Sequence, residues 1–200
     1  MDVFINERAV GAVEAVGATV GEMIEALGVH VDPDEIVTTV EIDGITFSAG
    51  DGERYARRGA GSVRRLVLGT STPAAFARCM RAELAAAVEV VASKVDLVVA
   101  HFAAGDDRDA NALLAALMEE LRLALVLEQQ VATLDGAVVP EAVEPVQTVA
   151  PALLSAQERR AWGELSTLLA HELAPALRAW SRAESSLAGD PASAAPSSTF

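Results

Sequence analysis

The sequence has few aromatic residues, one cysteine and no long uncharged apolar run. Aromatic residues occupy 4% of the 200 positions while 52% are hydrophobic, so alanine, valine and leucine must fill most of the core. Because Cys79 is the only cysteine, no intramolecular disulfide can form, and nothing indicates an oxidising compartment. No apolar run reaches the roughly 18 residues of a membrane-spanning helix. Residues 1–7 carry two acids and no basic residue, unlike a signal peptide, so we expect a cytoplasmic protein without membrane insertion.

Basic residues are also scarce. The chain has 15 Lys and Arg against 29 Asp and Glu, for a net charge of −14. Acids outnumber bases both in residues 1–72 and in residues 73–200. Neither part therefore supplies the basic surface that neutralises phosphates, and nucleic acid and anionic membrane surfaces are excluded as expected partners.

Residues 1–71 begin with short strand patterns and one helix. Residues 2–6 alternate in the manner of a strand, and residues 10–16 are predicted to return as a second strand. Thr19 and Glu22 have the spacing of a capping box, in which each side chain pairs with the other residue's backbone N–H. A short amphipathic helix is expected to follow.

The second half of this region is predicted to be mostly strand. Residues 36–42 are rich in β-branched side chains, which favour a strand. Asp43-Gly44 is a hairpin signal, and residues 45–47 supply the start of the answering strand. Residues 48–61 contain four glycines and indicate a loop, and residues 63–68 predict a final strand.

Residues 72–136 predict two long antiparallel helices. Thr72 followed by Pro73 is typical of a helix N-cap with proline at the first helical position, where its missing N–H costs nothing. Gly105 and the acids after it separate the two helices. Because this break is short, the helices are expected to fold back as a hairpin. The apolar positions that recur at helical spacing are Phe76, Met80, Leu84, Val88, Val91, Val95, Val98 and Phe102, then Leu113, Leu117, Leu121, Ala124, Leu127, Val131 and Leu134.

The remainder of the chain predicts a linker, a third helix and a tail. Residues 137–151 contain three prolines, which argue against a continuous helix and for a proline-rich linker. Residues 152–184 predict a third amphipathic helix that opens at Ser155 and is kinked by a proline. The Ser-, Ala- and Pro-rich residues 185–200 predict a disordered tail.

The fold class expected from these elements is α+β: a β-grasp-like head followed by a helical hairpin or bundle. The head resembles the ubiquitin-like β-grasp fold. Sulfur carriers and protein modifiers of that fold work through a terminal Gly-Gly, which this sequence lacks both after the last head strand and at Phe200. The head and hairpin are also similar to a group of uncharacterised bacterial proteins. The resemblance rests on Ile5-Asn6-Glu7, Thr19 to Glu22 and Glu41 to Gly44, and it implies a fold but no activity or site.

No residue pattern predicts catalysis or a bound cofactor. The histidines, His30, His101 and His171, stand far apart and lack a second ligand at metal-binding spacing. Cys79 is interpreted as a small core or boundary residue rather than a reactive thiol. We therefore expect no enzyme activity, no catalytic or metal-binding residue and no cofactor.

Two groups of residues are candidates for docking a partner. Five arginines lie within twelve residues of an otherwise acidic chain, and guanidinium groups bind carboxylates and phosphates bidentately. They can equally pair with acids of the same chain. The two tryptophans lie about five helical turns apart and share a face that suits an interface or the interior of the protein. The candidate docking residues are Arg54, Arg57, Arg58, Arg64, Arg65, Trp162 and Trp180.

The function expected from these features is protein–protein interaction. The first hypothesis is a non-enzymatic interaction or scaffold protein that self-associates through its helices, with a protein partner or a second copy as its ligand. An acidic export or assembly chaperone that holds a partner helix in an apolar groove is the second. A ligand-sensing or enzymatic domain with a cryptic pocket is the third.

Overall fold

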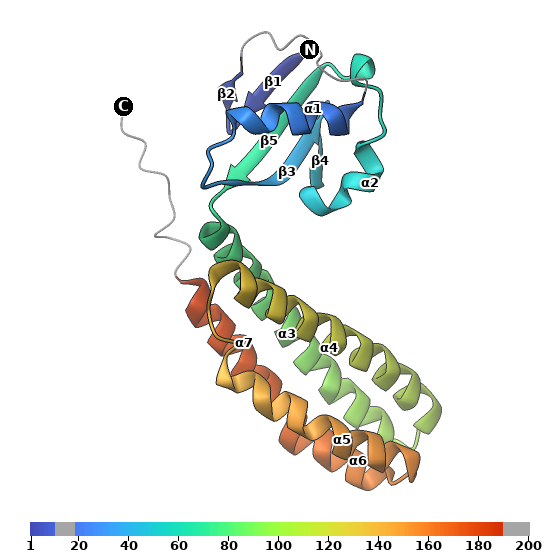
Figure 1. Ribbon diagram of the computed structural model, residues 1–200. Helices are drawn as coiled ribbons and strands as arrows, with labels where there is room; N and C mark the ends of the chain where they lie inside the picture. The colour runs from blue at the N-terminus through green and yellow to red at the C-terminus, as the bar shows by residue number, and fades with distance from the viewer. Residues whose placement is uncertain (11–18, 190–200) are drawn as a thin grey trace. The chain divides into compact units, whose positions relative to one another are not determined.

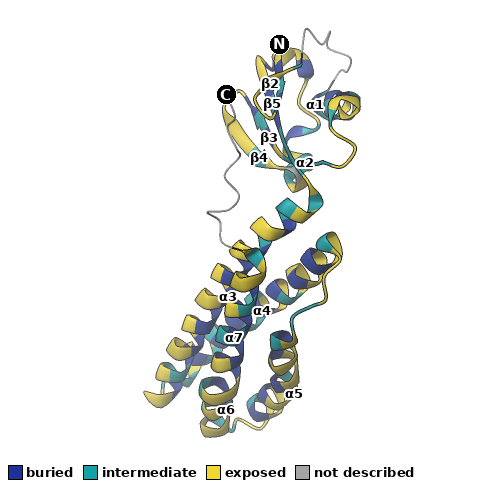
Figure 2. Cartoon of the chain, turned by 90° about the vertical axis from the view of Figure 1, so that its left-hand side faces the viewer, coloured by how far each residue is buried: buried dark blue, intermediate teal, exposed yellow. Residues whose placement is uncertain are grey.

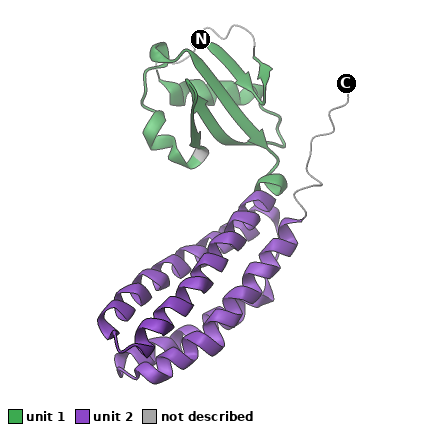
Figure 3. Ribbon diagram, turned by 180° about the vertical axis from the view of Figure 1, so that it is seen from behind, with its two compact units in different colours: residues 1–76 green, residues 77–200 purple. Residues whose placement is uncertain are grey.

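The computed structural model describes residues 1–10 and 19–189, and the chain divides into two compact units (Figure 3). The first unit spans residues 1–76 and the second residues 77–200. The first contains a mixed five-stranded sheet with short helices, and the second contains long packed helices. The predicted α+β class is therefore confirmed.

The sheet of the first unit has the strand order β2-β1-β5-β3-β4 (Figure 1). Its central pair, β1 (Asp2–Ile5) and β5 (Arg65–Ser71), is parallel. The other pairs, which involve β2 (Arg8–Ala9), β3 (Ile36–Ile42) and β4 (Ile45–Ser48), are antiparallel. The first and last strands of the unit thus lie side by side, although more than 60 residues separate them in sequence.

Helix α1 (Val20–Leu27) begins at the predicted capping box. The Thr19 hydroxyl accepts from the backbone N–H of Glu22 at 3.3 Å, and the Glu22 carboxylate accepts from the backbone N–H of Thr19 at 3.2 Å. The predicted return strand is displaced, because Asn6 and Glu7 form a tight turn with positive φ and pairing starts at once in β2. Residues 11–16 of that prediction lie outside the described residues.

The predicted hairpin at Asp43-Gly44 is confirmed, and both residues have positive φ, as a type I′ turn requires. The predicted loop over residues 48–61 is wrong in part. Short 3-10 segments and the one-turn helix α2 (Gly52–Tyr55) occupy it, with Tyr55 buried. Burying such an aromatic ring gives even a glycine-rich segment a fixed conformation. The last strand runs to Ser71, three residues beyond its predicted end.

One face of the sheet carries the core of the first unit. Val3 on β1 and Ile42 on β3 both lie level with Leu66 on β5, so three neighbouring strands present buried side chains at one height. Met23 and Leu27 of α1 belong to the same cluster and are also buried. The amphipathic helix is therefore held by its apolar face against the sheet.

The second unit opens with two long helices, as the sequence predicts. Helix α3 (Pro73–Ala103) begins after Thr72, whose hydroxyl accepts from the backbone N–H of Ala75 at 3.2 Å. Helix α4 (Asp107–Asp135) follows a short break and ends at Gly136, which adopts the left-handed conformation. The lone Lys94 of α3 reaches Glu120 of α4, with Nζ 2.7 Å from Oε2, and this ion pair marks the register of the antiparallel pair.

The prediction of a proline-rich linker over residues 137–151 is wrong for most of its length. A 3-10 turn at Glu141–Val143 leads into helix α5 (Glu144–Glu158). Pro145 stands in the first turn, where proline is tolerated, but Pro151 stands inside the helix. Four buried side chains of α5 join the core, and this burial outweighs the hydrogen bond that Pro151 cannot make. They are Val146, Val149, Leu153 and Ala156.

The predicted third helix over residues 152–184 is divided differently. Ser155 lies inside α5 rather than at a helix start, and the chain reverses at Arg160, whose φ is positive. Helix α6 (Trp162–Leu168) continues through a π-helical turn (Leu169–Leu173) into α7 (Ala174–Ala188). The irregularity that the sequence predicts near Pro175 is this π-helical turn. The helix also includes residues 185–188, which the predicted tail would leave disordered, and residues 190–200 lie outside the described residues.

A single hydrophobic cluster joins all the helices of the second unit. Figure 2 colours the buried residues along these helices. Its buried side chains come from α3, α4, α5, α6, the π-helical turn and α7. Helix α5 and the continuous segment from α6 to α7 therefore complete a bundle on one side of the α3–α4 pair.

Candidate functional site

An apolar groove runs between α3 and α4, and its lining combines exposed side chains with four buried ones, Leu84, Val91, Ala124 and Val131. It encloses about 490 Å³, and most of its lining is aliphatic. Val90 and Leu123 flank it, with half of each side chain's area exposed (55% and 50%), and Leu127 is 40% exposed. Leu97 and Leu134, further along the same two helices, are similarly exposed. A row of large exposed aliphatic side chains of this kind marks a contact surface in soluble proteins.

Each long helix has one row of apolar side chains buried in the bundle core and a second row that remains exposed. The groove stays open because the other helices of the bundle do not cover the second row. On α3, the inner row includes Val88 and Val95, which are buried in the core, while Ala87 and Val90 point away from it. The bundle's other segments, α5 to α7, contribute no residue to the groove. Carboxylates of Glu83 and Glu120 stand among the lining residues.

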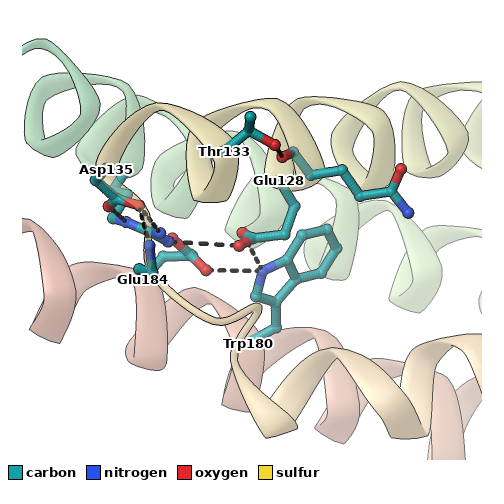
Figure 4. A network of polar contacts seen from close by, with 8 residues as sticks. Glu128, Thr133, Asp135, Trp180 and Glu184 are labelled. Carbon is teal, nitrogen blue, oxygen red and sulfur yellow. Dashed lines mark hydrogen bonds and ion pairs between the residues drawn. The ribbon is translucent and has the colours of Figure 1, made fainter. Parts of the chain in front are cut away.

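A cluster of charged residues is buried inside the same bundle, where α3, α4 and α7 meet (Figure 4). The guanidinium of Arg81 donates from Nε to Asp135 Oδ2 at 3.0 Å and from Nη1 to Glu184 Oε2 at 2.8 Å. The same Nη1 lies 3.4 Å from Glu128 Oε1. The indole Nε1 of Trp180 donates to Glu184 at 3.2 Å and to Glu128 at 3.4 Å. Every one of these groups except Asp135 is almost wholly removed from solvent.

The charges in this cluster do not balance. One guanidinium faces three carboxyl groups, and two of these, Glu128 and Glu184, are fully buried. Burial, together with the hydrogen bond to the neighbouring Glu184, raises the pKa of Glu128 to about 7. The hydrogen bond from Arg81 holds the pKa of Asp135 below its ordinary value. Glu128 therefore keeps its proton to a higher pH than an exposed glutamate does, and the cluster carries less negative charge than its composition suggests.

Sequence reasoning missed this cluster, although a signal was present. Arg81, Glu128 and Glu184 each stand in phase with the buried positions of their helices, between Ala77 and Leu84 for Arg81 and between Ala124 and Val131 for Glu128. The sequence-based stripe on α4 passed through Leu127 instead of Glu128, because leucine is the more usual core residue. A charged residue in phase with an apolar stripe indicates a buried ion pair. The cluster joins three helices, α3, α4 and α7, inside the bundle.

The five candidate arginines do not form one free cationic patch. Arg58 makes an ion pair with Asp43 at 2.9 Å, and Arg54 lies 3.7 Å from Asp51 and over the ring of Phe47. Arg65 stacks on the ring of Phe4, with Cζ 5.0 Å from the ring centroid. The alternative in which arginines pair with the protein's own groups therefore describes these three.

Of the five candidates, Arg57 and Arg64 are exposed and their side chains make no ion pair or side-chain hydrogen bond with the described residues. Their neighbour Asp43 is held by the backbone N–H groups of Arg64 and Arg65 and by the Arg58 guanidinium. These contacts lower the pKa of the Asp43 carboxyl, with the backbone hydrogen bonds as the largest cause. Asp43 thus serves the hairpin turn and pairs with one of the five arginines, Arg58.

The two candidate tryptophans have different environments. Trp180 is completely buried and bound to the ionic cluster, so it is not part of the surface. Trp162 is half-buried and stacks on Phe102, with ring centroids 5.4 Å apart. The alternative in which the tryptophans pack inside the protein describes both contacts.

The histidines and the cysteine do not gather into a metal site among the described residues. No group of three or more His, Cys, Asp or Glu side chains could hold a metal ion among the residues described. Nδ1 of His101 lies 3.1 Å from Asp106 Oδ2, as a helix-end contact. Of the two alternatives for Cys79, a core or a boundary residue, the core alternative is wrong, because Cys79 is exposed.

Comparison with known proteins identifies no relative: no family model, no curated protein and no solved structure matches the chain. None of the described helices combines the length and the apolarity needed to cross a membrane. The groove and the buried cluster must therefore be interpreted from their own chemistry.

Proposed function

We propose that this protein is a non-enzymatic protein–protein interaction or scaffold protein, and that the groove between α3 and α4 is its contact surface. The observation that carries the proposal is the row of half-exposed aliphatic side chains along the groove, formed by Val90, Leu123 and Leu127. Leaving such side chains in water costs about 25 cal/mol for each Å² of apolar surface. A partner that covers the groove recovers this free energy.

The rigidity of the bundle supports the same proposal. The ionic cluster around Arg81 joins α3, α4 and α7 by hydrogen bonds, and a preformed surface loses less conformational entropy on binding than a mobile one. The groove is also accessible from solvent, which suits a macromolecular ligand better than a small enclosed substrate.

The first unit is proposed to be a β-grasp-like head. The strand order β2-β1-β5-β3-β4, with a parallel central pair and one helix on the sheet, supports this assignment. Its exposed Arg57 and Arg64 are the remaining arginines that could contribute to docking. We propose no carrier chemistry for the head, because its last strand continues into α3 rather than into a free glycine terminus.

The shape of the groove also favours the second candidate, a chaperone that holds a partner helix. Two antiparallel helices with an aliphatic channel between them accept the apolar face of a third helix. The two candidates share the surface and differ only in what occupies it.

The proposal is tested by site-specific photocrosslinking in the cells that produce the protein. A benzophenone amino acid is placed at Ala87, an exposed position that lines the groove, and in a matched control at Glu172, an exposed position on the π-helical turn. We expect a discrete protein adduct from position 87 and none from position 172. Equal labelling at both positions, or no adduct at either, would contradict the proposal, and mass spectrometry of the adduct identifies the occupant.

A further inference from the structure

We infer that the occupant of the groove is a second copy of this chain, packed end-for-end so that α3 meets α3 and α4 meets α4 in antiparallel orientation. This inference rests on the proposed function, because it names the partner of the same groove. It follows from the spacing and the charges of the residues along the outer row of each helix.

The outer row of α3 has the spacing of a coiled-coil seam. Its members follow one another at alternating steps of three and four residues, the heptad pattern that keeps one face of a helix toward a partner. None of them belongs to the buried core of the bundle. They are Met80, Glu83, Ala87, Val90, Lys94 and Leu97.

This seam is complementary to itself when one copy is reversed. Reversal places Met80 level with Leu97 of the partner copy and Ala87 level with Val90, so these two layers each pair apolar side chains. The remaining layer pairs Glu83 with Lys94. These two residues lie eleven positions apart on one helix, about 16 Å, and cannot reach each other within one chain. Only a reversed second copy brings them together.

The outer row of α4 has the same symmetry about the same point. Its members are spaced by four and three residues, and reversal pairs Leu123 with Leu127, Glu120 with Gln130 and Ala116 with Leu134. The centre of this row is residue 125. The ion pair between Lys94 and Glu120 fixes the level of α3 against α4, and it places residue 125 within about one residue of the centre of the α3 row. One two-fold axis therefore serves both helices, as a symmetric dimer requires.

A second symmetric dimer is conceivable, and the charges of the two helices favour the end-for-end arrangement over it. A two-fold axis parallel to the helices would place α3 on the partner's α4 and bring identical residues to the same level. The two Glu83 carboxylates would then share a layer that holds no cation. In the end-for-end arrangement each Glu83 meets a Lys94, which binds Glu120 of its own chain on its other side. Opposite charges across an interface set its orientation in this way.

The experiment is a charge exchange between two full-length variants, Glu83→Lys and Lys94→Glu. Each variant alone places two like-charged pairs across the proposed interface, so its dimer should dissociate at least about tenfold more readily than that of the parent protein. When the two variants are mixed, both pairs become opposite in charge. We expect the heterodimer to exceed either homodimer, as measured by native mass spectrometry with one variant isotopically labelled. Circular dichroism of each variant checks that the helices remain folded.

Three results would overturn the inference: a parent protein that stays monomeric at 100 μM, variants that dimerise as well as the parent, or a mixture that shows no preference for the heterodimer. The last result, with a stable parent dimer, would indicate the arrangement of α3 on α4. A monomeric parent whose groove still forms an adduct with another protein would overturn the dimer and leave the proposed function intact. A monomer without any adduct would overturn both.

Discussion

The carboxyl group of Glu128 titrates near neutrality because it is buried beside a second carboxyl group. Its pKa is about 7 in the folded protein and near the ordinary 4.5 when the chain is unfolded. Between these values the folded chain holds a proton that the unfolded chain has released. The contribution of Glu128 to stability is therefore favourable in mild acid and is lost as the pH rises through about 7. Asp135 has the opposite dependence, because Arg81 lowers its pKa and its contribution is lost only in acid, below pH 4.

We expect Glu128→Gln to remove most of the pH dependence of stability between pH 5.5 and 8.5. The amide matches the protonated acid in shape and carries no charge at either pH. The advantage of the variant over the parent should grow by about 2 kcal/mol between pH 5.5 and pH 8.5, since the parent loses about 1.4 kcal/mol for each pH unit up to the pKa of Glu128. Urea unfolding of both proteins at the two pH values measures this difference. A parallel dependence in parent and variant would show that Glu128 is charged throughout.

Two prolines, Pro151 in α5 and Pro175 in α7, interrupt the backbone hydrogen bonds of the last helices. In α5, Pro151 stands in the middle of the helix and cannot donate to the carbonyl of Gln147 four residues before it. Before α7, the helix widens into a π-helical turn over Leu169–Leu173, in which the N–H of Ala174 donates to the carbonyl of Leu169. Pro175, which has no N–H to donate, follows directly. The helices persist at both places because their apolar faces are buried in the bundle core.

We expect Pro151→Ala to stabilise the bundle by about 1–2 kcal/mol. The substitution restores the missing hydrogen bond and removes the steric conflict of the ring, which together disfavour proline by about 3 kcal/mol inside a helix. The greater freedom of the unfolded chain offsets about 1 kcal/mol of this gain. Thermal unfolding followed by circular dichroism measures the change. Because Pro151 is exposed, little core packing is lost, and a lower melting temperature would mean that α5 is bent to fit the ring.

The two units have separate cores. The cluster in the head contains no residue beyond Leu68, and the cluster in the bundle begins at Leu84. The segment that joins them includes Thr72, whose side chain caps α3 and belongs structurally to the helix. Each unit therefore carries the apolar contacts on which its own stability depends.

We expect residues 72–200 to fold without the head. The isolated segment should give a helical spectrum and unfold cooperatively at the temperature of the helical transition in the full chain, within a few degrees, because no core contact is removed. A segment that begins at residue 77 is the matched comparison, and it should be less stable because it lacks the first turn of α3 and the Thr72 cap. A longer segment that remains unfolded would show that the bundle depends on the head.

Elements whose signals are local can be predicted from the sequence alone. The capping box at Thr19, the Asp43-Gly44 turn and the Thr72 cap are each formed by residues within a few positions of one another, so their chemistry can be recognised without knowing the fold. The paired long helices followed from apolar spacing and a short break, for the same reason. The combination of strands and helices then gave the α+β class.

Features that depend on residues far apart in the chain follow from the packing of the helices and cannot be predicted locally. Burial against the bundle turned a proline-containing segment into α5, although its local sequence argued for a linker. The ionic cluster joins Arg81 to Glu184, 103 positions away, and no local pattern pairs them. The open groove was equally hidden, because both rows of α3 are apolar and only the packing of the other helices determines which row remains exposed. Local rules determine which elements form, whereas competition among faces for burial determines which surface is left for a partner.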